Sequence, residues 1–164
     1  MFRLTAVMLL LAAHCAVLHA ADLDIEVRGI RLRTGQVHAA LFGSPEDFAI
    51  DLTFLAMISP EGILNTSVVT REGGMPRPPT ETATAPANAR SVHLQMFDLQ
   101  PGTYSVAVYH DVNGDGKLDT TLDGNPLEPW GLSNNPPANG KPPAWDETRF
   151  VLPSEGARLI INLR

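Results

Sequence analysis

Residues 111–119, reading Asp-Val-Asn-Gly-Asp-Gly-Lys-Leu-Asp, carry oxygen-bearing side chains at alternating positions around a glycine. A hard cation such as calcium takes about six to eight oxygen ligands, and a short loop supplies them through this alternation while glycine permits a sharp turn. The residues at the first, third, fifth and ninth places are Asp111, Asn113, Asp115 and Asp119. The spacing therefore predicts that these four side chains bind calcium.

The twelfth place of the pattern, where a bidentate Glu is expected, is Leu122. We assign the closing ligand to Asp123, with Glu128 as the alternative if the chain curls back. A metal-free turn is the competing interpretation, because Asn, Asp and Gly are turn formers whose side chains bond their own backbone. Five acids against one Lys in residues 111–128 favour a bound cation, because unscreened carboxylates repel one another.

A second candidate site is the long acidic and Pro-rich loop that follows, residues 120–145. Its two tryptophans, Trp130 and Trp145, predict a carbohydrate-binding module as the alternative function if their rings form a stacking platform. The competing interpretation is that both rings pack against proline and cover the open end of the fold. Asn134 or Asn135 could also add an oxygen to the calcium loop. A glycan array with and without chelator would separate the two functions.

The sequence does not predict an enzyme. His110 and Asp111 are neighbours on an extended run, so their side chains point to opposite faces and cannot pair as a base and its orienting acid. No Ser stands in the nucleophile elbow of hydrolases. His38 and His93 each alternate with apolar residues, which predicts that both are solvated. We therefore expect no catalytic residues.

The elements that position the calcium loop are predicted to be strands. Apolar residues alternate with polar ones in most of the chain after residue 21, and turn residues separate the runs. This pattern predicts an all-β protein, a single Greek-key-type β-sandwich of about seven strands, with residues 104–110 delivering Asp111 to one end. The first two runs are predicted to pair as a hairpin. The runs are 23–27, 37–41, 92–96, 104–108, 148–152 and 159–163, with a less regular one at about 62–69.

The remaining segments predict connections. Ser44 followed by Pro45 is typical of a helix start and predicts one short helix running to about Met57. Residues 75–88 are rich in Pro, Thr and Ala and predict an exposed loop. A tight turn at Pro101-Gly102 precedes Tyr104, whose hydroxyl is predicted to bond back to the turn as the tyrosine corner of Greek-key sandwiches.

One stretch resembles a known family. Residues 99–135 contain Pro-Gly-Thr-Tyr at 101–104, Val-Tyr-His-Asp at 108–111, Asn-Gly-Asp-Gly-Lys-Leu-Asp at 113–119 and Gly-Leu-Ser-Asn-Asn at 131–135. In these motifs the chain resembles exported bacterial proteins grouped as domain of unknown function 2141. The resemblance implies a β-sandwich of the transthyretin or carboxypeptidase-regulatory type with no assigned activity. It supports the fold and leaves the function open.

The N-terminus is typical of a secretory signal peptide. Arg3 precedes a short apolar run that ends in small residues at Ala20 and Ala21, and the run is too short to span a bilayer. We expect residues 1–20 to be a signal peptide and residues 21–164 to be a single periplasmic or secreted domain. Removing residues 1–20 takes away Cys15, which is the single cysteine, and leaves 11 basic residues against 18 acids, a net charge of −7.

That charge argues against nucleic acid and anionic membranes as partners, because both are bound through basic patches. An unidentified protein or a glycan is the expected partner. No later segment is long and apolar enough to span a membrane.

We predict that the mature protein begins at Ala21 or Asp22, because small residues close the apolar run there. Mass spectrometry of the periplasmic or secreted fraction checks this start. An intact Met1, or a lipid on Cys15, would contradict it.

Overall fold

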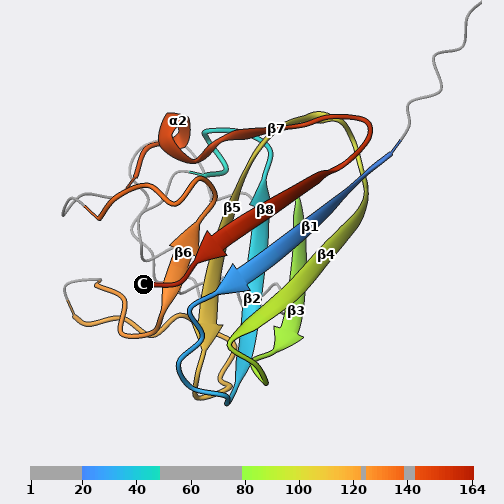
Figure 1. Cartoon of the computed structure of the whole chain (residues 1–164). Helices are drawn as coiled ribbons and strands as arrows, with labels where there is room; N and C mark the ends of the chain where they lie inside the picture. The colour runs from blue at the N-terminus through green and yellow to red at the C-terminus, as the bar shows by residue number, and fades with distance from the viewer. Residues whose placement is uncertain (1–19, 49–78, 123–124, 139–142) are drawn as a thin grey trace, which may run out of the picture.

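The computed structural model describes residues 20–48, 79–122, 125–138 and 143–164. Within them, eight strands form two sheets packed face to face, as Figure 1 shows, so the predicted all-β sandwich is confirmed. The signal peptide, the strand predicted at 62–69, most of the helix predicted from Ser44 and the proposed ligand Asp123 lie outside the described residues. The strands are β1 (Ala21–Arg28), β2 (Gln36–Phe42), β3 (Glu81–Pro86), β4 (Ser91–Leu99), β5 (Gly102–Asp111), β6 (Trp130–Leu132), β7 (Phe150–Leu152) and β8 (Ala157–Asn162).

The first sheet has three strands in the order β4-β1-β8. Its central strand, β1, runs antiparallel to β4 and parallel to β8. Leu23, Ile25 and Val27 of β1 are buried, whereas the residues between them are at least partly exposed, as the period-two pattern predicts. This sheet therefore has one face on the core and one face in solvent.

The second sheet has the order β3-β2-β5-β6, and β7 pairs with the start of β5. The hairpin predicted from the first two runs is wrong, because β1 and β2 belong to different sheets. Residues 29–35 cross between the sheets, and Gly29 and Gly35 adopt positive φ values of 88° and 71° within this connection. All residues of β2 after Gln36 are buried, as expected for a strand covered on both faces rather than for the solvated half of a hairpin.

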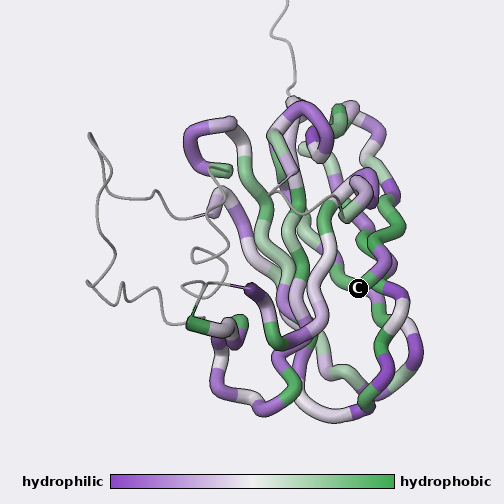
Figure 2. The backbone as a smooth tube through the Cα atoms, turned by 90° about the vertical axis from the view of Figure 1, so that its left-hand side faces the viewer, coloured by the Kyte–Doolittle hydropathy of each residue, from purple (hydrophilic) through white to green (hydrophobic). Residues whose placement is uncertain are grey.

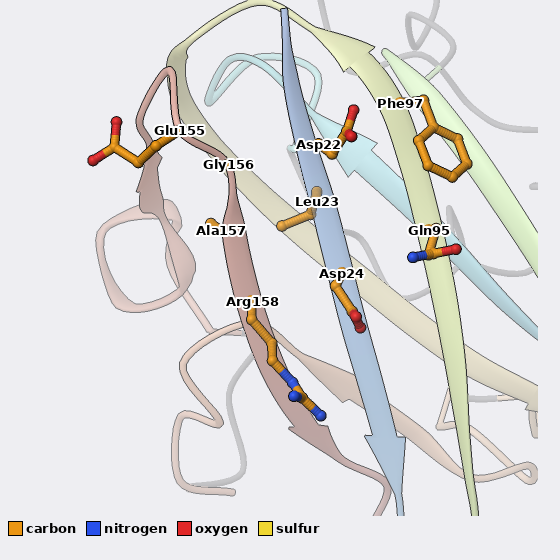
Figure 3. Close-up of a pocket in the computed structure, with 9 residues that line it drawn as sticks. All are labelled: Asp22, Leu23, Asp24, Gln95, Phe97, Glu155, Gly156, Ala157 and Arg158. Atoms are coloured by element: carbon orange, nitrogen blue, oxygen red, sulfur yellow. The ribbon is translucent and has the colours of Figure 1, made fainter.

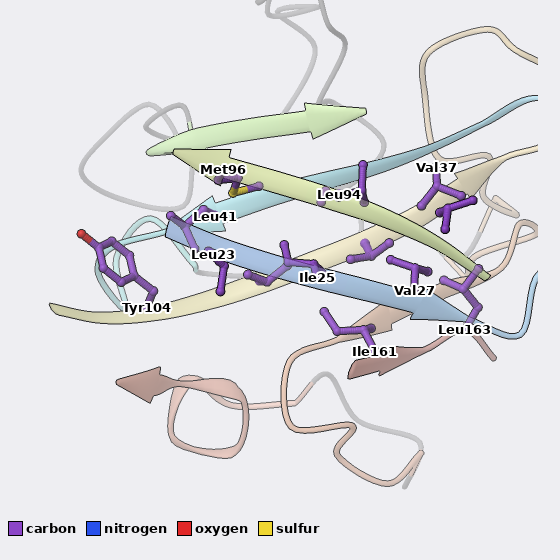
Figure 4. Packing of buried hydrophobic residues seen from close by; sticks show 14 of the residues in the cluster. Leu23, Ile25, Val27, Val37, Leu41, Leu94, Met96, Tyr104, Ile161 and Leu163 are labelled. Carbon is purple, nitrogen blue, oxygen red and sulfur yellow. The ribbon is translucent and has the colours of Figure 1, made fainter. Parts of the chain in front are cut away.

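The main core lies between the two sheets. Figure 4 shows Leu23, Ile25 and Val27 of β1 beside Leu94 and Met96 of β4, all packed toward the second sheet. A second, smaller core lies on the opposite face of the five-stranded sheet. It contains Ala40, Phe42, Phe48, Ala107, Tyr109, Leu118 and Leu132, with Trp130 and Trp145 packed against it. Figure 2 shows hydrophobic and hydrophilic stretches alternating along the chain that forms these layers.

Three connecting segments differ from the prediction. Residues 81–86, predicted as an exposed loop, form the edge strand β3, where short Thr and Ala side chains suffice because little of the strand is buried. Its last residue, Pro86, suits an edge strand, which need not donate every amide to a ladder. The predicted long loop contains β6, and a short helix, α2 (Trp145–Thr148), precedes β7.

Among the described residues, no helix is long and apolar enough to cross a membrane.

Residues 44–48, the described part of the predicted helix, form a single turn. The Ser44 side-chain oxygen accepts the Asp47 amide at 3.1 Å, and its carbonyl accepts the Phe48 amide at 3.0 Å. This turn places Phe48 in the second core, 5.5 Å from the Trp145 ring centre.

Tyr104 makes the predicted bond at the start of β5. Its hydroxyl donates to the Gln100 carbonyl at 2.8 Å, and only 8% of the residue is exposed. Burial raises the pKa of this hydroxyl, so it remains a donor at neutral pH. The bond fixes the turn that delivers β5.

We predict that Tyr104→Phe lowers the free energy of unfolding by about 0.5–1.5 kcal/mol, because it removes one partly buried hydrogen bond and keeps the ring. Urea unfolding measures the change, and far-UV circular dichroism should stay β-like in both proteins. A wild-type spectrum dominated by helix, or a variant as stable as wild type, would contradict this account of the corner.

Candidate functional site

Asp111 ends β5 and is buried, with 1% of its surface exposed. One carboxylate oxygen, Oδ1, accepts the amides of Gly114 and Asp115 at 2.7 and 3.2 Å. The other, Oδ2, accepts the Gly116 amide at 2.8 Å. The loop therefore folds around this one carboxylate, which makes charge-assisted hydrogen bonds to three of its backbone amides.

Glu128 joins the two ends of the loop. Its Oε1 accepts the Val112 amide at 2.7 Å and its Oε2 accepts the Asp119 amide at 3.1 Å. The residue is 8% exposed. The chain therefore curls back and brings Glu128 to the loop, as its role as the alternative closing ligand required. The hydrogen bonds that Glu128 makes there are to backbone amides.

The other predicted ligands are on the surface of this framework. The Asn113 side-chain amide donates to Asp119 Oδ2 at 3.0 Å, and Asn113 Oδ1 accepts the Asp115 amide at 3.0 Å. Asp115 Oδ1 accepts the Lys117 amide at 3.0 Å. The structure therefore brings Asp111, Asn113, Asp115, Asp119 and Glu128 into one connected cluster.

The hydrogen bonds decide how much ligand capacity each side chain retains. An ionised carboxylate offers about four acceptor positions. Asp111 uses three of them on amides. Asp115 and Asp119 each accept one described bond and keep most of their positions. Asp111 therefore shapes the loop, whereas Asp115 and Asp119 have the oxygens that a cation could take.

His38, predicted to be solvated, is instead buried at 7% exposure beside Asp111. Its ring stacks on Tyr109 with centres 4.9 Å apart, and its Nε2 lies 3.6 Å from Asp111 Oδ2, too far for a hydrogen bond. Burial lowers the pKa of His38 and the Asp111 charge opposes that shift. A neutral His38 leaves the Asp111 charge uncompensated. Among the described residues it is nevertheless the sole basic side chain within 4 Å of the loop carboxylates.

The hydroxyl of Thr84, the imidazole of His38 and the carboxylate of Asp111 lie in a row across the sheet. Thr84 Oγ1 lies 3.1 Å from His38 Nδ1. The row comes from three adjacent strands, because His38 of β2 faces Thr84 of β3 in the sheet register. The imidazole has no hydrogen bond to Asp111, whose oxygens hold the loop, so the row lacks the oriented base of a hydrolase. His110 is fully buried and its Nε2 donates to the Thr34 carbonyl at 2.7 Å.

The loop is attached to the fold at three points. Leu118, at the apolar eighth place, is 1% exposed and packs in the second core. The Tyr109 hydroxyl donates to the Gly116 carbonyl at 3.0 Å. Gly35 passes so close to the Asp111 carbonyl that a Cβ there would overlap it. These contacts hold the loop over the outer face of the five-stranded sheet.

The two tryptophans and two asparagines of the second candidate site serve other contacts. The Arg164 guanidinium lies 4.0 Å above the Trp130 ring, and Trp145 packs against Phe48. The asparagines, predicted as helpers of the calcium loop, bond elsewhere: Asn134 donates to the Arg149 carbonyl at 2.9 Å and Asn135 to the Ile160 carbonyl at 2.7 Å. The tryptophans thus help cover the sheet face rather than the open end of the sandwich.

Among the described residues, no three side chains of His, Cys, Asp or Glu converge closely enough to hold a metal ion, and Asp123 lies outside those residues. Sequence reasoning placed the loop correctly but missed His38, Gly35 and Tyr109 as its supports. The sequence signal for His38 was the almost continuous apolar run of residues 37–42, which is typical of a strand covered on both faces.

Fold and site together define a small β-sandwich with an acidic loop at one end of its larger sheet. The chain belongs to the DUF2141 family, described as uncharacterized protein conserved in bacteria, whose model matches residues 56–160. No curated protein and no solved structure matches the chain.

We predict that Gly35→Ala destabilises the protein more than Gly114→Ala. Both glycines have positive φ, 71° and 78°, so each alanine costs about 1–2 kcal/mol in backbone strain. A Cβ at Gly114 meets nothing within 4 Å, whereas one at Gly35 would displace the Asp111 carbonyl. Urea unfolding of both variants measures the difference. Equal losses would contradict the close packing of Gly35 against the loop.

Proposed function

We propose that this protein is an exported, non-catalytic binding domain whose loop of residues 111–128 binds calcium. The observation that carries the proposal is a loop whose backbone is already held by two buried carboxylates, Asp111 and Glu128, while Asn113, Asp115 and Asp119 keep oxygens at its surface. A preformed loop lowers the entropy that a cation must overcome on binding.

Electrostatics supports a cation in this position. The Asp115 amide bonds to the Asp111 carboxylate and the Asp119 amide bonds to the Glu128 carboxylate, so these four acids share one short loop. Lys117 makes no ion pair with them among the described residues. Carboxylates at this spacing repel one another, and a divalent cation removes that repulsion. In the proposal, Asp123 completes the shell that the described side chains supply only in part.

The position of β1 supports the export part of the proposal. The strand begins at Ala21, whose side chain is 1% exposed, immediately after the predicted cleavage site. Processing after Ala20 would leave every residue of β1 in place, whereas processing after Ala21 would remove its buried first residue. We further infer that the sandwich is of the transthyretin or carboxypeptidase-regulatory type, which an experimental structure of the mature chain would test.

A non-catalytic role is supported by the polar side chains around the loop, because their hydrogen bonds go to the backbone. Asp111 and Glu128 accept backbone amides, and His110 is fully buried against the Thr34 carbonyl. Carbohydrate binding is the less favoured alternative, because Arg164 covers one face of Trp130 and Trp145 is packed on Phe48.

We predict that millimolar calcium raises the melting temperature of the mature protein. A ligand that binds only the folded state stabilises it by about 0.4–1.4 kcal/mol at one to ten times its dissociation constant. The affinity should lie in the range of extracellular modules, about 10⁻⁴ to 10⁻³ M. Differential scanning fluorimetry and tryptophan fluorescence measure the effect.

Asp115→Asn and Asp119→Asn should each remove most of the calcium-dependent shift. Asp98→Asn is the matched control, since Asp98 is exposed outside the loop and Asn tolerates its positive φ of 58°. Leu122→Glu should tighten binding if the twelfth position faces the ion. Unchanged melting and fluorescence of the wild type in millimolar calcium would identify the loop as a metal-free acidic turn.

A further inference from the structure

A groove of about 330 Å³ lies on the solvent side of the three-stranded sheet, at the opposite end of β5 from the calcium loop. Figure 3 shows its position across β4, β1 and the start of β8. Its volume is at the lower end of the range for ligand pockets, about 300–1,000 Å³. Such a space suits one or two side chains of a partner.

The groove forms where the pairing of β1 with β4 is irregular. The register shifts between Ala21 and Leu23, so that Phe97 and Asp98 of β4 together oppose Asp22. Asp98 adopts a left-handed φ of 58°, and its amide donates to Asp22 Oδ1 at 3.4 Å. A bulge of this kind bends a strand and redirects its side chains, and bulges are frequent beside functional sites.

The opposite wall also depends on backbone geometry. Gly156 has a φ of 88°, and a Cβ there would lie 2.7 Å from the Asp22 carbonyl oxygen. Any larger residue would push this wall away from β1. The close approach of Gly156 therefore sets the width of the groove at Asp22.

Charge divides the groove into two ends. At one end, Asp22 and Glu155 of the lining, and Asp98 next to Asp22 outside the lining, have no ion-pair partner among the described residues. Further along, Asp24 is paired with His93 at 3.0 Å. The Arg28 and Arg158 side chains both bind Glu26, which is not in the groove lining, at 2.7 and 3.1 Å. The Asp22 end is therefore negative and uncompensated.

Phe97 gives this end an apolar surface. Phe97 is 57% exposed. The preceding outward residues of β4, His93 and Gln95, are polar, so an aromatic ring is unusual on this face. In Figure 3 the Phe97 ring stands beside the Asp22 carboxylate. A carboxylate next to an exposed aromatic ring suits a cation on an aliphatic stem, because the ring attracts the charge and packs against the methylenes.

We propose that this groove binds a lysine or arginine side chain of a basic segment in a partner protein, with its charge at Asp22 and its stem on Phe97. The chain's net charge of −6 attracts such a segment. An anionic ligand would be repelled by Asp22, Asp98 and Glu155. The inference rests on the binding role proposed above but not on the calcium loop.

The test is a nuclear magnetic resonance titration of the mature, isotopically labelled protein with a peptide of alternating lysine and glycine. Its counterpart with glutamine in place of lysine is the uncharged probe. We expect shifts for the amides of residues 22–24, 95–98 and 156–158 with the lysine peptide only. Shifts of equal size with both peptides, or shifts confined to other surfaces, would overturn the proposal.

Two pairs of variants separate the groove from general attraction to an acidic protein. Asp22→Asn and Phe97→Ala should each weaken binding about two- to fivefold. Asp146→Asn changes the net charge equally, and Val151→Ala removes an apolar side chain of 67% exposure, both outside the groove. If the controls weaken binding as much as the groove variants, the attraction is non-specific and the proposal fails.

Repeating the titration with chelator separates this inference from the calcium proposal. Peptide binding should persist in chelator, because no groove residue belongs to the loop. Loss of peptide binding with an intact calcium-dependent melting shift would overturn the groove alone. If calcium leaves the melting temperature unchanged while the peptide still binds, the calcium proposal alone is overturned.

Discussion

The buried Asp111 carboxylate is the interaction on which one whole end of the molecule depends. It accepts three amides from the loop that follows β5, and that loop then places Leu118 over Tyr109 and Ala107 on the outer face of the larger sheet. Without an anionic acceptor at the end of β5, the loop would lose the three charge-assisted hydrogen bonds that fix its backbone. The acidic loop is therefore a structural cover for this end of the larger sheet.

That cover makes the two sheets unequal. The five-stranded sheet is buried on both faces at β2 and β5, whereas the three-stranded sheet keeps a solvated face of alternating charged residues. Recognition surfaces need exposed groups on a rigid support. Among the described residues, the loop after β5 and the groove on the solvated sheet face offer such groups, and these two places lie toward opposite ends of β5.

Period-two alternation was enough to predict the sandwich and most strand positions, because half-buried strands such as β1 and β4 carry that pattern directly. It could not predict which strands pair. The crossing at residues 29–35 depends on long-range burial of β2, and β3 lacks the large apolar residues that mark a strand. The spacing of the Asp111 loop was readable, but the role of His38 was not, since it arises from register between distant strands.

The parallel pairing of β1 with β8 has a consequence for how this chain acquires its fold. Ile25 lies opposite Leu159, so β1 pairs with a strand that lies far from it in the sequence. Closing so long a segment costs entropy before any contact is gained, and proteins dominated by such distant pairings fold slowly. The edge of β1 that pairs with β8 therefore stays open until residues 157–162 have been made, and an open strand edge can pair with other chains and aggregate in the meantime.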